Sequence, residues 1–361
     1  MSHRRKELQQ LIASPFAAQL VEAMPEPAIL VGPDGRAEAA NQRALGLLPG
    51  LKVGEPLVLA LRAPDVIDAL RRVMASGETE TVSWSERVPV ERVFDVTIAA
   101  LLSAEGGAVA TLLTLRDQTE FRQVERMRVD FVANASHELR TPLASLLGFI
   151  ETLQGSARDD PRARERFLVI MREQGRRMSR LIDDLLSLSR IEQKQHLRPD
   201  AVVDFTQITH GVVDALAPMA QDLGVEIRFS ASGPAQVLGD RDELVRIAEN
   251  LIENAIKYGV RPDEPGASVV EVAIATTPKH ATLTVRDHGH GIAAEHLPRL
   301  TERFYRVDAG QSRAKNGTGL GLAIVKHILT RHRGRLSIAS RIGQGSSFIA
   351  SIPLDNRQKN P

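Results

Sequence analysis

The chain has 361 residues, which is long for one hydrophobic core and predicts two or three domains. Its 46 basic and 45 acidic side chains give a formal charge of +1, so no overall field draws it to nucleic acid or to an anionic membrane, and we expect no direct nucleic-acid partner. The absence of cysteine excludes disulfides, thiolate metal sites and cysteine-based redox sensing.

The N-terminus and the longest weakly polar stretch lack the form of a signal peptide or a membrane span. Residues 1–6 read MSHRRK, and no clean apolar run follows them. The weakly polar stretch, residues 98–115, is broken by EGG at 105–107, which predicts two strands joined by a tight turn. We expect a cytoplasmic protein, or the cytoplasmic portion of an inner-membrane sensor, with no membrane span in this chain.

Residues 15–118 alternate short apolar runs with turn sequences. The runs at 28–31 (AILV) and 93–98 (VFDVTI) have the composition of strands, and 32–35 (GPDG) that of a turn. A strand, a turn, a helical patch and three closing strands predict a small α+β domain.

From residue 120 the apolar side chains recur every three or four positions, which indicates a helix. This helix begins with Phe121, Val124 and Met127 and continues to about residue 154, and a second helix with one apolar face follows a turn sequence at 155–161. The resulting hairpin, within residues 119–196, cannot bury its apolar stripe alone, and two copies would make an antiparallel four-helix bundle. We therefore expect a homodimer.

Residues 200–356 alternate strands and helices. We expect strands at 225–229, 269–275 and 281–287 and a closing hairpin within 336–352, with helices at 240–258 and 319–331. This pattern predicts an α/β sandwich. The chain as a whole is thus expected to be multidomain, with an α+β domain, a helical hairpin and an α/β sandwich in that order.

The first helix of the hairpin contains a histidine beside a carboxylate. Residues 131–143 read FVANASHELRTPL, with Thr141 one turn after His137. A neutral imidazole can accept a phosphoryl group, and Glu138 is placed to orient or deprotonate it. Pro142 removes a helical hydrogen bond and should bend the helix beyond His137. A single histidine on a helix is more often structural, so this interpretation depends on the motifs downstream.

Two asparagines lie on the helix expected at 240–258. Asn250 and Asn254 are four residues apart and share a face. An amide oxygen can coordinate a hard cation without adding charge beside a triphosphate, and Mg²⁺ prefers oxygen ligands, with phosphates completing its shell. Two surface amides on an ordinary helix are the alternative.

Glycine-rich turns follow the strand at 281–287 and precede the helix at 319–331. The carboxylate of Asp287 can accept a hydrogen bond from an adenine amino group, while glycines at 289 and 291 let the backbone approach the base. Residues 317–321 read GTGLG, whose free N–H groups and helix dipole favour phosphate. We expect residues 293–316 to form a mobile lid in which Arg306 is the candidate cation for charge on a transferred phosphoryl group.

The five motifs occur in order and together resemble the H, N, G1, F and G2 boxes of the two-component sensor histidine kinases. The resemblance covers about residues 118–355 and implies a kinase that autophosphorylates His137 from Mg-ATP and passes the phosphoryl group to an aspartate of a response regulator. It also implies that Asn254 holds Mg²⁺, that Lys257 approaches the phosphates and that Asp287 recognises adenine. The other nucleotide-contacting positions that it implies are Asn250, Tyr258, Gly289, Gly291, Ile292, Arg303, Phe304, Gly317, Thr318, Gly319, Leu320 and Gly321.

The resemblance implies a second activity and a separate partner. In this family the residue matching Thr141 aligns water for hydrolysis of the phosphorylated regulator, which implies a phosphatase activity. No receiver domain is visible in the sequence. We therefore expect a separate response regulator to dock around residues 143–152 and the second helix.

The first domain resembles a PAS sensor domain, through residues 24–31, the Ala-Asn pair at 40–41 and residues 116–120. His3 is the only histidine before residue 136, so we expect no histidine-ligated haem, and the lack of cysteine excludes a flavin–cysteine adduct. A PAS domain followed by FVANASHELRTPL most resembles the phosphate-regulon sensor kinases, which implies a role in phosphate-starvation signalling. The resemblance places the PAS domain at 15–118, the phosphoacceptor hairpin at 119–196 and the ATP-binding domain at 200–356.

Two other interpretations remain. A gyrase- or chaperone-type ATPase would explain the nucleotide motifs, but it would carry a general-base glutamate where Asn250 stands, and Glu249 beside it leaves the register open. It would not explain residues 137–142. A non-enzymatic ATP-binding scaffold would be expected to have lost Asn254, Asp287 or the glycines, which are all present.

Overall fold

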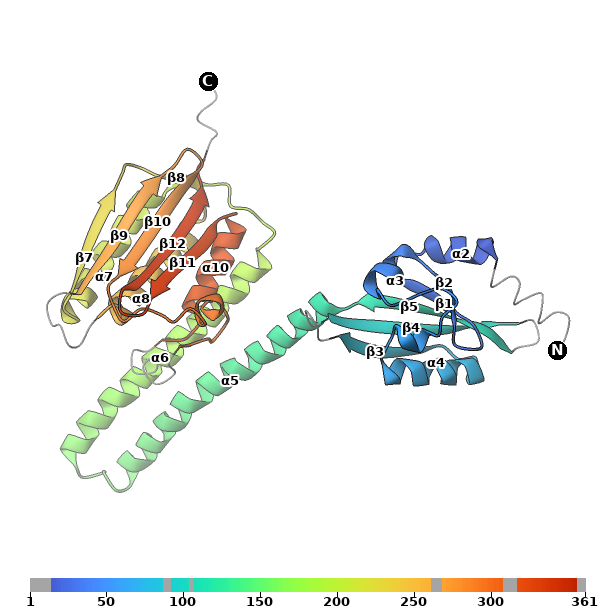
Figure 1. Ribbon diagram of the computed structural model, residues 1–361. Coiled ribbons are helices and arrows are strands. Elements are labelled where there is room, and N and C mark those ends of the chain that lie inside the picture. The colour runs from blue at the N-terminus through green and yellow to red at the C-terminus, as the bar shows by residue number, and fades with distance from the viewer. Residues whose placement is uncertain (1–13, 87–91, 104–106, 261–267, 308–316, 356–361) are drawn as a thin grey trace. The chain divides into compact units, whose positions relative to one another are not determined.

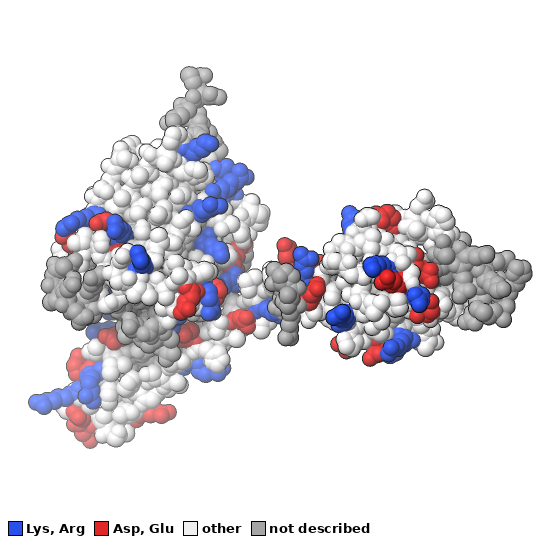
Figure 2. Space-filling view, in the orientation of Figure 1, with Lys and Arg blue, Asp and Glu red and all other residues white. Residues whose placement is uncertain are grey.

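The computed structural model describes residues 14–86, 92–103, 107–260, 268–307 and 317–355 (Figure 1). The chain separates into two compact units, Met1–Val132 and Ala133–Pro361. On the face in Figure 2, basic and acidic side chains are interspersed within each unit, in keeping with the formal charge of +1. None of the described helices contains a stretch that is both long and apolar enough to cross a membrane.

The first unit contains an antiparallel sheet with the strand order β2-β1-β5-β4-β3. One face packs against α4 around buried Leu57, Phe94 and Leu113, and the other face packs against α2 through Val21 and Leu30. Its strands are β1 (Ala28–Val31), β2 (Ala37–Ala40), β3 (Glu80–Glu86), β4 (Arg92–Leu102) and β5 (Ala108–Asp117). Its helices are α2 (Pro15–Glu22), α3 (Gln42–Leu47), η1 (Leu57–Leu59) and α4 (Pro64–Ser76).

One buried amide organises the start of this sheet. The Asn41 side-chain oxygen accepts hydrogen bonds from the backbone N–H of Ala28, at 3.0 Å, and of Ala44, at 2.9 Å. Its amide nitrogen donates to the carbonyl of Glu26 at 2.8 Å. Asn41 therefore caps the N-terminus of α3 and also binds the first residue of β1. These hydrogen bonds satisfy its amide group and explain why an asparagine is buried here.

The two long helices form the expected hairpin. They are α5 (Thr119–Gln154), which contains Pro142 and continues as helix beyond it, and α6 (Pro161–Gln193). Asp160 caps α6 by accepting from the backbone N–H groups of Arg162 and Ala163. Large apolar side chains stay exposed along both helices: Phe121, Val124, Met127, Val132, Leu143, Leu147, Ile150, Leu168, Ile182 and Leu186.

The C-terminal part of the second unit is a two-layer α/β sandwich (Figure 1). Its sheet has the order β11-β12-β10-β9-β7, with β7 and β9 parallel and the other pairs antiparallel, and α7, α8 and α10 pack on the sheet. The helices are α7 (Phe205–Asp222), α8 (Arg241–Tyr258), η2 (Leu297–Arg299) and α10 (Gly321–Arg331). The strands are β7 (Val225–Ala231), β9 (Ser268–Thr276), β10 (His280–Asp287), β11 (Arg335–Arg341) and β12 (Gly345–Pro353), with a small pair β6 (Val202–Asp204) and β8 (Gln236–Leu238).

The predicted multidomain fold class is confirmed, and several element ends differ by one or two residues: β7, for example, ends at Ala231 where residue 229 was expected. The helix expected from residue 319 begins at Gly321, because Gly319 has a φ of +74°, which no right-handed helix accommodates. Parts of two predicted features, the turn at 105–107 and the lid at 293–316, fall on residues 104–106 and 308–316, which lie outside the described residues.

Candidate active site

A cavity of about 970 Å³ lies between the α/β sandwich and the hairpin helix α6. This volume lies within the usual range of small-molecule sites. On the side of α6 the wall is formed by Arg180, Asp183 and Asp184. Twelve residues predicted as site residues also line it: Asn250, Asn254, Lys257, Tyr258, Asp287, Gly291, Ile292, Arg306, Gly317, Thr318, Gly319 and Gly321.

Helix α8 presents the two asparagines to the cavity. Asp240 caps the helix by accepting from the N–H groups of Asp242 and Glu243, and a fully buried stripe fixes its rotation: Leu244, Ile247, Ala248, Leu251, Ile252, Ala255 and Ile256. The amide nitrogen of Asn250 donates to the carbonyl of Arg246 at 2.8 Å, which orients the Asn250 oxygen. A Cβ on Gly321 would lie 2.3 Å from that oxygen, so glycine lets the start of α10 approach α8.

A lysine and a glutamate on α8 form an ion pair at the cavity wall. Lys257 Nζ lies 2.5 Å from Glu253 Oε1, one turn earlier, and the lysine side chain is mostly buried. Both residues line the cavity. Because an ammonium group is attracted to whichever anion approaches it, the triphosphate of a bound nucleotide would compete with Glu253 for Lys257.

Asp287 lies at the end of β10 and is only 6% exposed. Its Oδ1 accepts hydrogen bonds from the backbone N–H of Gly289, at 2.9 Å, and of Ser346, at 3.2 Å. Burial raises the pKa of the Asp287 carboxyl above its ordinary value, and those two hydrogen bonds oppose the rise. Both bonds use Oδ1, so Oδ2 is the oxygen available to a ligand in the cavity.

We predict that Asp287→Asn weakens nucleotide binding roughly 5- to 150-fold while stabilising the nucleotide-free protein. If the Asn oxygen keeps the two N–H groups, its amide nitrogen replaces Oδ2 and opposes the adenine amino group, donor against donor. The raised folded-state pKa means that Asp287 destabilises the fold once pH exceeds the unfolded-state pKa, so the gain in Tm should be larger at pH 7 than at pH 4.

Titration calorimetry measures the affinity of Asp287→Asn for ATP. Thermal melts at pH 7 and at pH 4 measure the change in its Tm. Asp222→Asn, at the exposed end of α7, controls for the loss of one negative charge. Unchanged nucleotide affinity would remove Asp287 from adenine recognition.

Four of the predicted nucleotide contacts are absent from the cavity wall, and two of them are Leu320 and Gly289. Leu320 is fully buried, and a Cβ on Gly289 would lie 2.6 Å from the carbonyl oxygen of Tyr258. Gly291 lines the cavity but has a φ of +71°, and a Cβ there would lie 2.0 Å from the carbonyl oxygen of Arg341. We expected these glycines to let the backbone approach the base, whereas their space is taken by the backbone of this chain.

Arg303 and Phe304 also lie outside the cavity wall. The backbone N–H of Phe304 donates to the carbonyl of Gly319 at 2.8 Å, and a Cβ on Gly319 would lie 2.9 Å from Phe304 Cα. Arg303 instead forms an ion pair with Glu192 on α6. Phe304 therefore joins the predicted lid segment to the glycine-rich turn, and Arg303 joins it to the hairpin.

The glycine-rich turn is also joined to the hairpin. Thr318 Oγ1 donates to Asp184 Oδ2 on α6 at 2.7 Å, and Arg246 on α8 lies 3.5 Å from Asp184 Oδ1. Burial raises the pKa of Asp184, although its hydrogen bond from Thr318 opposes the rise. Asp184 therefore links two elements of the sandwich to α6 at the edge of the cavity.

The residue next to the candidate acceptor is bound by two arginines. His137 is exposed on α5, and Thr141 Oγ1 donates to its backbone carbonyl at 3.2 Å. Glu138 accepts from both terminal nitrogens of Arg306, at 3.0 and 3.3 Å, and from Arg177 on α6 at 3.1 Å. We expected Glu138 to act on His137, but here its carboxylate pairs with two partly buried cations, which hold it more strongly than a neutral imidazole can.

Sequence reasoning missed the polar residues of α6. Arg177, Arg180 and Asp184 are spaced three and four apart, so they lie on one face of the helix. Arg177 pairs with Glu138 on α5, whereas Arg180 and Asp184 line the cavity. The signal that could have found them is the interruption of the apolar stripe of α6 by charges at helical spacing. Two glutamates in the site, Glu192 and Glu253, carry no motif that would separate them from other surface carboxylates.

The same segments match known protein families. Residues 21–123 match the PAS fold, residues 127–194 match the His Kinase A (phospho-acceptor) domain, and residues 239–356 match the histidine kinase-, DNA gyrase B- and HSP90-like ATPase family. The PAS match therefore covers the sheet of the first unit, and the lining of the cavity comes from the phospho-acceptor and ATPase matches together.

Known sensor proteins are similar in sequence to this chain over most of its length. It is 36% identical over 331 residues to the phosphate regulon sensor protein PhoR of Pseudomonas aeruginosa, covering 90% of this chain and 71% of that protein. It is 31% identical over 327 residues to the sensor protein kinase WalK of Staphylococcus saprophyticus, covering 89% of this chain and 52% of that protein. The solved structure of the Acinetobacter baumannii histidine kinase AdeS is 26% identical, with a TM-score of 0.48 over 61% of this chain and 98% of that one. With a PAS domain, a phospho-acceptor hairpin and an ATP-binding domain in one chain, and this identity to PhoR, the protein belongs to the sensor histidine kinases, the ATP-dependent protein-histidine kinases of two-component signalling.

Proposed function

We propose that this kinase transfers the γ-phosphoryl group of Mg-ATP to His137. The observation that carries the proposal is the ion pair between Glu138, the neighbour of His137, and Arg306, which lines the nucleotide cavity. This pair links the helix of the acceptor to the cavity within one protein unit.

In the proposed step a ring nitrogen of neutral His137 attacks the γ-phosphorus in line. The N–P bond forms as the bond from phosphorus to the bridging oxygen breaks, ADP leaves with that electron pair, and the imidazole keeps a positive charge until its other N–H loses a proton. Glu138 takes or steadies that proton after it separates from Arg306. The freed guanidinium of Arg306 then stabilises the negative charge on the phosphoryl oxygens.

We assign nucleotide contacts to the cavity residues. Asp287 Oδ2 accepts from the adenine amino group, and Lys257 exchanges Glu253 for the phosphates. The N–H groups of residues 317–321 and the N-terminus of α10 face the phosphates, in line with the favourable dipole at a helix start.

The residues present fit Mg²⁺. Asn254 offers a neutral amide oxygen in the cavity, a hard ligand that Mg²⁺ accepts. Within the described ranges no group of three or more His, Asp or Glu lies together as a metal site, so phosphates and water must complete the shell. Bound there, the ion would neutralise charge on the triphosphate, and Asn254 would hold it on the face of α8.

The test of the proposed chemistry is the nature of the transferred phosphate. Incubation with γ-labelled ATP and Mg²⁺ should give a protein label that is lost in acid and kept in base, as a phosphoramidate is. Nucleotide binding without label would support an ATP-binding scaffold, and release of inorganic phosphate without label would support an ATPase.

We propose a response regulator as the acceptor of the phosphoryl group from His137. The support is the resemblance of the whole motif series and the exposure of His137, which leaves the imidazole accessible to a second protein. The phosphoryl group would pass to a receiver aspartate, with cleavage of the N–P bond and formation of an acyl phosphate. Transfer of label from the kinase to a receiver domain is the direct assay.

Thr141→Ala should keep autophosphorylation within about twofold and lower phosphatase activity toward the phosphorylated regulator about tenfold or more, because a positioned water is lost. The Thr141 hydroxyl is exposed one turn after His137 and bonds only to a backbone carbonyl among the described contacts. Thr330→Ala is the matched control, since its hydroxyl makes the same i−4 bond on α10. Equal loss of both activities in Thr141→Ala would make the residue structural.

We propose that two copies associate through the hairpin. The support is the row of exposed apolar side chains on α5 and α6, which includes Leu143, Leu147 and Ile182. A second copy would cover this row as a four-helix bundle. Sedimentation should give twice the 39.5 kDa chain mass, and a 39.5 kDa particle at micromolar concentration would contradict the proposal.

The proposed signalling context is phosphate starvation. The support is the sequence resemblance stated above together with 36% identity to a protein named as a phosphate regulon sensor. The chain should restore a phosphate-starvation reporter in cells that lack such a sensor. A failure to restore it, with normal autophosphorylation, would reject this context and leave the kinase assignment intact.

A further inference from the structure

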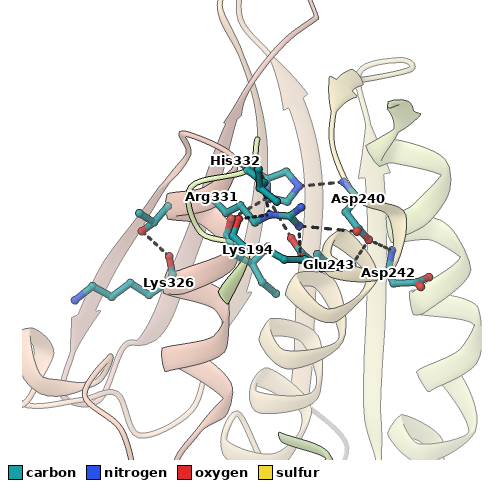
Figure 3. Close-up of polar contacts among 10 residues, drawn as sticks. Lys194, Asp240, Asp242, Glu243, Lys326, Arg331 and His332 are labelled. Carbon is teal, nitrogen blue, oxygen red and sulfur yellow. Dashed lines mark hydrogen bonds and ion pairs between the residues drawn. The ribbon is translucent and has the colours of Figure 1, made fainter. Parts of the chain in front are cut away.

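A buried polar cluster lies where the hairpin joins the ATP-binding domain (Figure 3), and its members are not among the residues that line the nucleotide cavity. Arg331, the last residue of α10, is 8% exposed, and its neighbour His332 is 1% exposed. Asp240 and Glu243, at the start of α8, face them. The fifth member is the backbone of Lys194, where α6 ends.

The Arg331 guanidinium binds the end of the hairpin. Its Nε donates to the carbonyl oxygen of Lys194 at 3.2 Å and to that of Leu197 at 2.9 Å. Lys194 is the C-cap of α6, and Leu197 follows in the connection to β6. Carbonyls at a helix C-terminus lack helical partners and carry partial negative charge, so a buried cation there satisfies both needs.

The same guanidinium is held from the side of α8. Its Nη1 forms an ion pair with Glu243 and lies 3.9 Å from Asp240 Oδ2. The backbone N–H of Asp240 donates to His332 Nε2 at 3.2 Å, while His332 Nδ1 lies 2.8 Å from the carbonyl of Ile328. An accepting Nε2 and a donating Nδ1–H define a neutral imidazole, in agreement with burial, which lowers the pKa of His332.

Helix α10 connects this cluster to the nucleotide cavity. Gly321, its first residue, lines the cavity against Asn250, and Arg331 is its last. Eleven residues span about 16 Å at 1.5 Å per residue. Ala323, Ile324 and Ile328 are buried between its ends, so the helix is packed as a rigid element.

We propose that Arg331 is a positioning residue for phosphoryl transfer: it fixes the end of α6 to α10, and thereby sets how the nucleotide cavity faces the helix hairpin that carries His137. This rests on the proposed function of His137. The connection at residues 194–200 is the covalent link between hairpin and sandwich. Asp184 and Glu192 bind the sandwich from within α6, whereas the Arg331 bonds hold the connection itself, so their loss loosens the end of α6. A small misplacement of donor and acceptor costs transfer rate but leaves nucleotide binding unchanged.

The geometry requires arginine. The planar guanidinium donates through Nε to the carbonyls of Lys194 and Leu197 and pairs through Nη1 with Glu243. A lysine ammonium is a single charged centre and cannot reach all of these partners at once. Removing Arg331 alone would leave Glu243 buried without its cation, and its Oε2 already lacks a hydrogen-bond partner among the described residues, with His332 Nδ1 3.7 Å away. The paired variant Arg331→Met with Glu243→Gln removes the cation and the anion together.

The full-length chain is used for the kinetic test. In the paired variant and in Arg331→Lys, the labelling rate at saturating ATP should fall about tenfold or more, and the half-saturating ATP concentration should change less than about twofold. Arg335→Met, an exposed arginine on β11, is the control and should match wild type. A full rate in the paired variant, or a rate loss with an equal rise in half-saturating ATP, would overturn the proposal, since the second outcome indicates damage to the nucleotide site.

A distance measurement separates this proposal from the proposed function. The chain has no cysteine, so Leu168→Cys on α6 and Leu223→Cys after α7, both exposed, accept spin labels selectively. With labelled chains diluted in unlabelled protein, the distance distribution should be broader in the paired variant than in the doubly labelled parent. An equally narrow distribution would overturn the role of Arg331. If the parent does not label with phosphate at all, the proposed function fails, while the distance result still decides whether Arg331 fixes the hairpin.

Discussion

Asn254→Ala should lower the rate of autophosphorylation of His137 about 10³-fold or more without unfolding the protein. The bound metal ion stabilises the transition state by several kcal/mol, and the loss of about 4 kcal/mol lowers a rate about 10³-fold. Asn254 lines the cavity and lies beside the buried stripe of α8. Among the described contacts its side chain makes no hydrogen bond, and alanine is the better helix former, so Tm should hold or rise slightly.

The readout is the initial labelling rate over a series of Mg²⁺ concentrations. Wild type should saturate with Mg²⁺, whereas Asn254→Ala should stay near background at every concentration. Gln221→Ala, an exposed amide on α7, controls for the removal of an amide from a helix surface and should behave as wild type. Undiminished labelling of Asn254→Ala would remove this residue from the metal role.

Glu138→Gln should lower autophosphorylation roughly 10²- to 10⁴-fold, the usual contribution of a positioned base. In the structure Glu138 pairs with Arg306 and Arg177, so the described arrangement precedes transfer. In the proposed step Glu138 exchanges these cations for His137. The amide of glutamine keeps the shape of the side chain but cannot accept the proton from the imidazole.

The sign of the Glu138→Gln effect separates two roles of this carboxylate. If Glu138 served only to hold Arg306 away from the nucleotide, the variant would free Arg306 and raise the labelling rate. Arg177→Met is the companion variant, because it removes one of the two cations on Glu138 and leaves the carboxylate in place. Its rate should equal or exceed that of wild type, whereas a rate as low as that of Glu138→Gln would mean that the ion pair itself, and not the carboxylate, is required.

Much of the fold follows from local patterns. The change from period two to period three and four near residue 120 predicts α5, which begins at Thr119. Asp240 at an N-cap and the apolar spacing behind it predict α8. The start of α10 was predicted two residues early, because the left-handed φ of Gly319 is imposed by contact with Phe304, a residue 15 positions earlier in the chain.

The site is predictable only in part, for the same reason. Motif residues such as Asn254 and Asp287 lie on single elements whose faces the sequence sets, and both line the cavity. The ion pair of Glu138 with Arg306 joins residues 168 positions apart, and no periodicity or spacing connects them. Arg331 is similar, since its partners at the end of α6 are backbone carbonyls, which are the same in every sequence.

The central claim is that His137 receives the phosphoryl group, and the most direct test is to locate the label. The experiment incubates three proteins with γ-labelled ATP and Mg²⁺: wild type, His137→Gln and His210→Gln. His210→Gln is the control, because His210 is also an exposed histidine on a helix, where it pairs with a carboxylate on α7. We predict acid-labile label in wild type and His210→Gln and none in His137→Gln, although all three bind ATP equally. Label that persists in His137→Gln would contradict the account and place the acceptor elsewhere in the chain.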